Sequence, residues 1–291
     1  MALVTLKDIL SEAVRKNCAV PAFWGGDFVT AEACLMAAEE KKVPLILLVH
    51  PVANKLFGNN YELYLRFLKD MCRAVSVPVT FILDHGRNFQ QCAEFLSYGA
   101  PSLMFDGSTL PREENTAATR EIVKMAHAAG VSVEGEIGHV GSLAESKHEG
   151  DGGNAVYTDP EDALMFAERT GVDALAISIG TMHGIYTGTP KLDIERLKKI
   201  RQTVGSLPLV MHGGSGLPDE AFKQAVSNGI NKINYVTYMQ LKSVKAMKDV
   251  IAAQNGGKFS TFQALDVARE TMYKVALEQF DLFNTTKLSL S

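Results

Sequence analysis

Short apolar segments of strand length recur along the chain and alternate with longer segments that have helical spacing. These apolar segments are hydrophobic throughout, which is typical of parallel strands covered on both faces. Eight strand–helix units of this kind favour one α/β barrel of the (β/α)8, or TIM-barrel, type over an open doubly wound sheet. We therefore expect a single domain over residues 1–291. The expected strands are residues 18–24, 43–50, 77–85, 100–107, 131–138, 172–180, 207–214 and 230–237.

Two regions depart from this alternation. Residues 139–157 form a long, polar, glycine-rich segment between the fifth expected strand and the next helix. Long loops in compact domains are usually lids or disordered segments. We expect a mobile active-site loop here, with an incidental insertion as the alternative. From about residue 238 onward the pattern is helical, and we expect a C-terminal helical extension that contacts another subunit.

The composition limits the partners and the location of the protein. The 33 acidic and 29 basic residues give a net charge of −4, which argues against nucleic-acid binding. The longest apolar runs are strand-sized, whereas a membrane-spanning helix needs about 20 residues, so no membrane partner is expected. The first residues lack a continuous signal-peptide core. The four cysteines are scattered without a C-x-x-C pair, so free thiols in a cytoplasmic protein are expected.

Three histidines, His85, His183 and His212, fall at or beyond the ends of three different expected strands, and each is followed by glycine. TIM barrels carry their reactive residues at the carboxyl ends of the strands. Three neutral imidazoles leave one open position on Zn²⁺, which is the arrangement of a catalytic metal site. Any one of these histidines is more often structural, but the three together favour a shared metal ion.

The other histidines carry a weaker signal. His50 and His139 lie near the same ends of the barrel, but a structural role is the favoured interpretation for both. His127 falls in an expected helix and His148 in the long loop, so we expect both to face solvent.

A second cluster lies after the seventh and eighth strands, where barrels often bind phosphate through backbone N–H groups. The loop "HGGSG" at 212–216 offers Gly213, Gly214 and Ser215, and "NYVT" at 234–237 adds the side chains of Asn234 and Thr237. The alternative is a glycine-rich turn without a ligand. The chain has no Walker A motif and no G-x-G-x-x-G, so nucleotides are not indicated.

In this arrangement the sequence resembles the class II, zinc-dependent ketose-bisphosphate aldolases, which include fructose- and tagatose-bisphosphate aldolases. The resemblance covers roughly residues 80–240 and keeps the order of the family's motifs. The matching segments are "LDHG", "LMFDGS", "VEGEIG", "IGTMHGIY", "LVMHGGSGLP" and "INKINYVT".

The resemblance implies a lyase that cleaves a phosphorylated ketose, a ketose 1-phosphate or 1,6-bisphosphate, into dihydroxyacetone phosphate and an aldehyde. It implies Zn²⁺ bound by His85, His183 and His212, and Asp84 as the acid/base on the substrate hydroxyl. It also implies a monovalent cation, Na⁺ or K⁺, and a homodimer or homotetramer. Acids near the metal would be Asp106 and Glu136, and the phosphate would be bound by Gly184, Gly213, Ser215, Asn234 and Thr237.

Three positions depart from the family's pattern. Trp24 stands where the family commonly has a substrate-binding Asn, and Val236 stands where fructose-bisphosphate members carry Asp. In the long loop, Glu145 is one residue out of register, so Glu145 and Glu149 both remain candidates for the second proton transfer. We therefore expect a related ketose 1-phosphate, with or without a second phosphate, rather than fructose 1,6-bisphosphate.

Two other functions remain open from the residues. A non-catalytic sugar-phosphate-binding barrel would keep the pocket without turnover. A metal-dependent hydrolase would use the same fold, but those enzymes often begin with an H-x-H pair on the first strand, and none is present.

Overall fold

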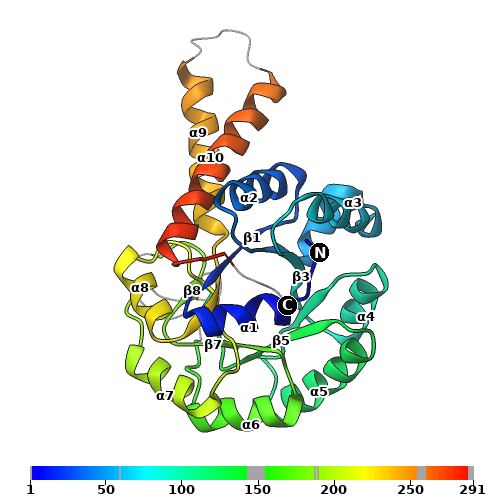
Figure 1. Cartoon of the computed structure of the whole chain (residues 1–291), viewed down its shortest axis with the longest axis vertical. Coiled ribbons are helices and arrows are strands. Elements are labelled where there is room, and N and C mark those ends of the chain that lie inside the picture. Colours follow the sequence, from blue (N-terminus) through cyan, green and yellow to red (C-terminus); the bar gives the residue numbers. More distant parts are fainter. Residues whose placement is uncertain are drawn as a thin grey trace.

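The fold is a closed barrel of eight parallel strands surrounded by helices (Figure 1), as the sequence predicts. The computed structural model describes residues 2–58, 60–142, 155–186, 188, 190–253 and 260–287. Around the barrel the strands run β1-β2-β3-β4-β5-β7-β9-β10, and β10 closes onto β1. They are β1 (Val20–Trp24), β2 (Leu45–Val49), β3 (Val79–Gly86), β4 (Ser102–Phe105), β5 (Ser132–Ile137), β7 (Ala174–Ile177), β9 (Leu209–Met211) and β10 (Ile230–Asn234).

The helices between the strands form the outer layer, and the largest apolar cluster lies between this layer and the barrel wall. A 3-10 helix, η1 (Pro51–Phe57), follows β2. The layer consists of α2 (Phe28–Lys41), α3 (Tyr61–Ala74), α4 (Phe89–Ser97), α5 (Arg112–Ala128), α6 (Pro160–Thr170), α7 (Ile194–Val204), α8 (Asp219–Ser227), α9 (Thr237–Ala253) and α10 (Thr261–Leu282).

One end of the barrel is closed by α1 (Leu6–Lys16), which lies across the barrel axis in Figure 1. Its buried face, with Leu6 and Leu10, packs on the side chains inside the barrel. The Leu6 N–H also donates to two hydroxyl groups of the wall, Ser102 Oγ at 2.7 Å and Ser132 Oγ at 3.0 Å. Burying each such leucine stabilises the fold by about 1.5–3 kcal/mol. This end of the barrel is therefore filled by packed side chains, and the carboxyl ends of the strands are the end that is open to a ligand.

A small two-stranded ribbon lies at the open end and was not predicted. β6 (Gly141–Ser142) pairs in parallel with β8 (Met182–His183). Just before it, His139 and Val156 form an antiparallel bridge across the base of the long loop. Residues 143–154, with Glu145, His148 and Glu149, lie outside the described residues, so the mobile active-site loop stays a prediction.

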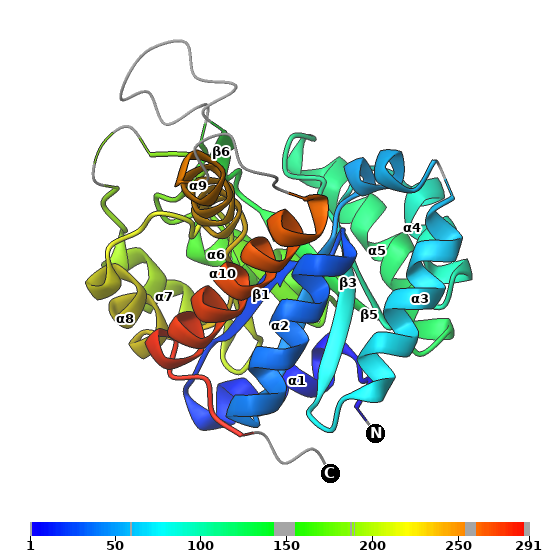
Figure 2. The same cartoon turned by 90° about the horizontal axis from the view of Figure 1, so that it is seen from above.

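The C-terminal helices α9 and α10 form a hairpin that projects from the barrel beside α2 (Figures 1 and 2). This confirms the expected helical extension, whereas its contact with another subunit stays a prediction. Neither α10, the longest of the helices in the described ranges, nor any other of them is long and apolar enough to cross a membrane.

Candidate active site

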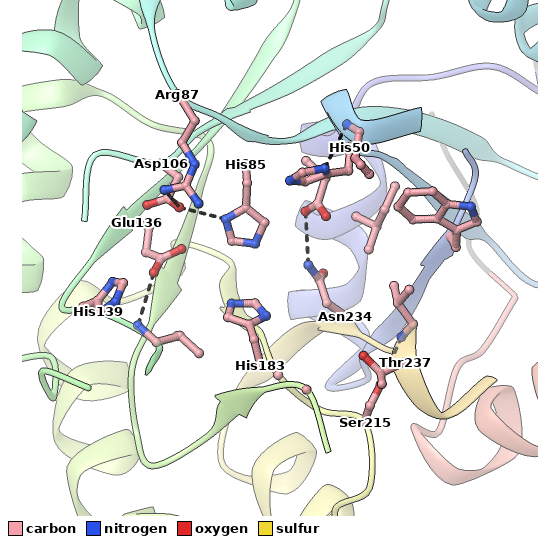
Figure 3. A pocket seen from close by; sticks show the side chains of 18 residues that line it. His50, His85, Arg87, Asp106, Glu136, His139, His183, Ser215, Asn234 and Thr237 are labelled. Atoms are coloured by element: carbon pink, nitrogen blue, oxygen red, sulfur yellow. Dashed lines mark hydrogen bonds and ion pairs between the residues drawn. The ribbon is translucent and has the colours of Figure 1, made fainter. Parts of the chain in front are cut away.

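The structure brings the three histidines together at the open end of the barrel. His85 lies at the end of β3, His183 on β8, and His212 directly after β9. One nitrogen of each lies within 4.8 Å of the others. The ring planes are steeply inclined to one another, by 74°, 85° and 88°, and the ring centroids are 4.9–5.8 Å apart. Side chains from three separate strand–helix units therefore converge on one point. Figure 3 shows two of them, His85 and His183.

Two of these rings are oriented by buried carboxylates. Asp106 Oδ2 lies 2.8 Å from His85 Nδ1, and Glu134 Oε1 lies 2.8 Å from His212 Nε2. An ionised carboxylate only accepts hydrogen bonds, so these two ring nitrogens carry the protons. In the neutral rings the other two nitrogens, His85 Nε2 and His212 Nδ1, carry lone pairs, and they face each other at 3.2 Å.

That separation fits a shared zinc ion. Two lone-pair nitrogens cannot hydrogen-bond to each other, but Zn–N distances of about 2.0–2.1 Å in a tetrahedral site place ligand nitrogens roughly 3.3–3.4 Å apart. Burial and the neighbouring His85 and His212 lower the pKa of His183, which favours its neutral, metal-binding form. Burial lowers the pKa of His85, but the charge of Asp84 and the hydrogen bond to Asp106 outweigh this effect and raise it to about 9, so a metal ion binding there displaces a proton. With that proton displaced, the three imidazoles form a donor set of the kind that binds Zn²⁺ in catalytic sites.

Behind His212 lies a buried ion pair that the sequence analysis missed. Lys232 Nζ on β10 is 2.9 Å from Glu134 Oε2 on β5, and His212, Glu134 and Lys232 are all fully buried. Burial raises the pKa of Glu134, but the charge of Lys232 and the hydrogen bond from His212 outweigh this effect and lower it to about 2. The signal was present: a lysine inside a buried strand needs a buried anion as its partner.

The two acids expected near the metal also line the cavity. Asp106 accepts hydrogen bonds from the Ser108 hydroxyl at 2.6 Å and pairs with Arg87 Nη1 at 3.0 Å, besides His85. Burial raises the pKa of Asp106, but its hydrogen bonds to His85 and Ser108 outweigh this and hold the pKa well below its usual range. Burial, with the nearby Asp106 charge, raises the pKa of Glu136. His85, Asp106 and Glu136 offer a second set of candidate ligand atoms within 4.8 Å.

Asp84 faces the same cavity although it adjoins His85 on one strand. Successive side chains of a strand normally point to opposite faces. Here His85 has a left-handed backbone (φ 53°), and the pairing of β3 with β4 shifts register between Leu83 and Gly86. This irregularity lets both side chains line the cavity. Asn234 Nδ2 donates to Asp84 Oδ1 at 3.4 Å, which fixes the carboxylate across the barrel.

The expected phosphate site forms another wall. Ser215 accepts a hydrogen bond from the Val236 N–H at 3.1 Å, and Thr237 is the first residue of α9, so the helix begins at the cavity. Gly213 has φ +65°, and a Cβ there would lie 2.5 Å from the Met182 carbonyl oxygen, so only glycine fits. Gly214 does not line the cavity and instead donates its N–H to the Asn234 carbonyl. The predicted residues that line it are Gly184, Gly213, Ser215, Asn234 and Thr237.

The cavity has a volume of about 360 Å³, and its remaining side is formed by residues near the ends of β1 and β2. Trp24, His50 and Val52 lie here. In Figure 3 His50 lies on the other side of His85 from Arg87 and Asp106. His50 was expected to be structural, yet its imidazole lines the cavity. The expected proton-transfer residues Glu145 and Glu149 lie outside the described residues.

Comparisons with known proteins agree with this geometry. The chain matches the family described as fructose-bisphosphate aldolase class-II over residues 4–287. A fructose-bisphosphate aldolase of Geobacillus stearothermophilus is 40% identical over 254 residues, which are 87% of each chain. A probable fructose-bisphosphate aldolase of Bacillus subtilis is 36% identical over 98% of this chain and 99% of its own. The crystal structure of the YdjI aldolase from Escherichia coli K12 has 32% identity and a TM-score of 0.83, covering 97% of this chain and 98% of that one.

The chain therefore belongs to the class II fructose-bisphosphate aldolase family. It is an aldolase, a carbon–carbon lyase, and not the hydrolase or the non-catalytic barrel that the residues alone left open. Membership of class II implies a divalent metal ion, typically zinc.

Proposed function

We propose that this aldolase reversibly cleaves a ketose 1-phosphate, with or without a second phosphate, into dihydroxyacetone phosphate and an aldehyde. The observation that supports it is one cavity lined by two members of the three-histidine cluster, His85 and His183, together with an acid and a glycine-rich wall at a helix start. Relatives named fructose-bisphosphate aldolase support a phosphorylated ketose. Trp24 and Val236 stand where the aldolases that this sequence resembles commonly have Asn and Asp. These two differences favour a substrate other than fructose 1,6-bisphosphate.

The metal would be Zn²⁺, held by His85, His183 and His212. When bound, a zinc ion supplies Lewis-acid polarisation of the ketose carbonyl. Asp106 and Glu134 keep two of the rings in the tautomer that points a lone pair inward.

Asp84 is the group that moves the first proton. It removes the proton of the C4 hydroxyl while the C3–C4 bond breaks, the C4–O bond becomes the aldehyde carbonyl, and the electron pair stays on C3. Asn234 holds the carboxylate in place for this transfer. A glutamate of the long loop, Glu145 or Glu149, then protonates C3 to complete dihydroxyacetone phosphate. General acid–base steps of this kind contribute roughly 10²–10⁴-fold each.

The phosphate would lie against Gly213, Ser215 and Thr237, with Gly184 and Asn234 beside them. Gly214 would support this wall from behind, through its hydrogen bond to the Asn234 carbonyl. The start of α9 favours an anion there, because the first N–H groups of a helix lack partners within it. A monovalent cation, Na⁺ or K⁺, would bind to backbone carbonyls around Gly184 and Gly213. The support for it is that the Met182 carbonyl oxygen lies close to Gly213.

We further infer a cytoplasmic homodimer or homotetramer. The projecting hairpin supports an oligomer, since Phe262 is 86% exposed and Ile251 and Leu265 are about half exposed. The four cysteines are free and buried, as in proteins of a reducing compartment.

The test is metal analysis of the purified protein together with a coupled assay for dihydroxyacetone phosphate released from ketose 1-phosphates. We expect about one zinc ion per chain and measurable cleavage. His85→Ala should lose the metal and lower kcat/KM by roughly 10³-fold or more. His127→Ala is the matched control, because this histidine lies on α5 and pairs with Asp173, away from the cavity. Full metal content and activity in His85→Ala would rule out the assigned site.

A further inference from the structure

One side of the cavity has no part in the mechanism above. It consists of Trp24, His50, Val52 and Val236, which we call the β1–β2 wall. Trp24 is the last residue of β1, His50 and Val52 follow β2, and Val236 follows β10. These three strands are neighbours in the barrel, so the four residues lie on one sector of its open end. The wall begins beside Asp84, the group assigned to the C4 hydroxyl. It therefore faces the part of the substrate that leaves as the aldehyde.

Trp24 gives this wall a fixed, flat surface. The backbone of Gly26 lies directly against the indole: a Cβ at position 26 would be 2.4 Å from Trp24 Cζ2 and 3.0 Å from Ala53 Cβ. Any larger residue at 26 would have to displace the ring, so the indole packs closely against the Gly26 backbone. An aromatic face in this place offers apolar contact area to the C–H groups of a carbon chain.

His50 adds one hydrogen-bond donor. It is the N-cap of η1, and its Nδ1 accepts from the Val52 N–H at 3.1 Å, so the ring proton resides on Nε2. The Tyr61 hydroxyl donates to the His50 carbonyl at 3.0 Å and ties the same residue to α3. Burial lowers the pKa of His50, which keeps the imidazole neutral. Among the described residues, none accepts a hydrogen bond from Nε2, and His50 lines the cavity, where the charge of Asp84 acts on it.

Charge is unevenly distributed around the cavity. Arg87 is the one lysine or arginine among the described residues that line it, and its guanidinium pairs with Asp106 at 3.0 Å. Figure 3 places Arg87 on the far side of His85 from His50. A phosphate against the β1–β2 wall would face the carboxylate of Asp84 without a cation from the described part of the chain. Desolvating an anion without such a partner is unfavourable.

We propose that the β1–β2 wall is the subsite for the aldehyde half of the substrate and that it takes a neutral, hydroxyl-bearing chain. Trp24 packs against the C–H face of that chain, and His50 Nε2–H donates to one of its hydroxyl oxygens. The substrate class is then a ketose 1-phosphate without a second phosphate. This inference rests on the proposed aldolase reaction, and it narrows the substrate.

The test compares glyceraldehyde with glyceraldehyde 3-phosphate as acceptors for dihydroxyacetone phosphate, using the zinc-loaded enzyme. The two aldehydes differ only in the phosphate, and we expect kcat/KM to be roughly tenfold or more higher for the neutral one. His50→Ala should lower kcat/KM for glyceraldehyde by about 10–100-fold and leave propanal, which has no hydroxyl group, almost unchanged. A preference for glyceraldehyde 3-phosphate, or an equal loss with glyceraldehyde and propanal, would overturn the proposal.

His50→Asn shows whether the loss in His50→Ala comes from the missing donor or from a disturbed local fold. Asparagine keeps the N-cap of η1 but removes the imidazole donor, so it should show the same loss with glyceraldehyde as His50→Ala. Leu56→Ala is the matched control, since Leu56 lies on the same 3-10 helix, is 67% exposed and does not line the cavity. Normal kinetics with glyceraldehyde in His50→Asn would exclude the donor role.

A partial reaction separates this inference from the proposed function. Exchange of the C3 hydrogen of dihydroxyacetone phosphate with D2O, followed by NMR, uses the metal and phosphate sites but no aldehyde. The wild type and His50→Ala should exchange at equal rates. If the wild type did not exchange, the aldolase assignment of the site would fail. If exchange occurred but the His50 variants left the aldehyde preference unchanged, only the subsite would be wrong.

Discussion

The two sides of the cavity are built in different ways. The histidine cluster is interlocked: His212, Glu134 and Lys232 come from three strands, are fully buried and form one chain of hydrogen bonds and ion pairs. The β1–β2 wall depends on packing and on the single N-cap bond of His50, and Val52 is 52% exposed.

This difference implies different roles: the histidine cluster serves the reaction, and the β1–β2 wall serves the choice of aldehyde. A buried charge that loses its partner is destabilised by several kcal/mol, so changes in the histidine cluster should affect metal binding, folding and turnover together. The wall contains no charged pair and no expected metal ligand. Changes there should alter which aldehyde is accepted and leave the metal and the exchange reaction intact.

The largest expected effect that spares the metal is at Asp84. Asp84→Asn keeps the shape of the side chain but removes the proton acceptor, so kcat for cleavage should fall by roughly 10²–10⁴-fold. Zinc content and the exchange of dihydroxyacetone phosphate with D2O should both persist, because neither requires the C4 hydroxyl proton to move. Near-normal cleavage in Asp84→Asn would contradict its role, and loss of zinc would show that Asp84 supports the metal instead.

The next effect is at Lys232, behind the histidine cluster. Lys232→Met leaves Glu134 buried without its cation, and we expect a loss of about 3–5 kcal/mol in the free energy of unfolding. Metal affinity should fall by roughly 10–100-fold, because the orientation of His212 loses its support. Urea unfolding and competition with a chelator measure the two quantities.

A double variant tests whether the unpaired charge of Glu134 causes the loss of stability in Lys232→Met. Lys232→Met combined with Glu134→Gln removes both charges, and the glutamine carbonyl still accepts from His212 Nε2–H. We expect this pair to recover most of the stability lost in Lys232→Met. If Lys232→Met alone unfolded at the wild-type urea concentration, the interlocking of the cluster would be disproved.

The barrel was predictable because its strands are buried on both faces and read as apolar runs separated by helical spacing. Most predicted segments overrun the strands by one to three residues, as 207–214 overruns β9 (Leu209–Met211), whereas 77–85 stops one residue short of β3. Beyond Met211 the chain turns away at Gly213, which has φ +65°. The glycines of residues 212–216 indicate a turn, but the apolar run before them does not show at which residue the strand ends.

The convergence of His85, His183 and His212 followed from their positions at strand ends, because a closed barrel brings all such ends to one rim. Their partners were harder to predict. Lys232 and Glu134 are 98 residues apart and meet only through the stacking of side chains inside the barrel. His50 has the structural role that was favoured, as the N-cap of η1, and it also lines the cavity. The sequence did not indicate the second feature, because an N-cap histidine has the same sequence signal whether its second nitrogen faces protein or a cavity.

The smallest expected effect is at Tyr61, which supports the wall from behind. Tyr61→Phe removes the hydroxyl that donates to the His50 carbonyl but keeps the ring beside Phe95, with centroids 5.8 Å apart. Losing one such hydrogen bond costs about 0.5–1.5 kcal/mol in the stability of the wall. We therefore expect kcat/KM with glyceraldehyde to fall by roughly two- to tenfold. Tyr98→Phe is the control, because that hydroxyl bonds to Glu94 on the outer layer. Since the wall and the histidine cluster share no charged pair, zinc content and D2O exchange should not change in Tyr61→Phe. A loss of exchange as large as the loss with glyceraldehyde would mean that the two sides of the cavity are mechanically coupled.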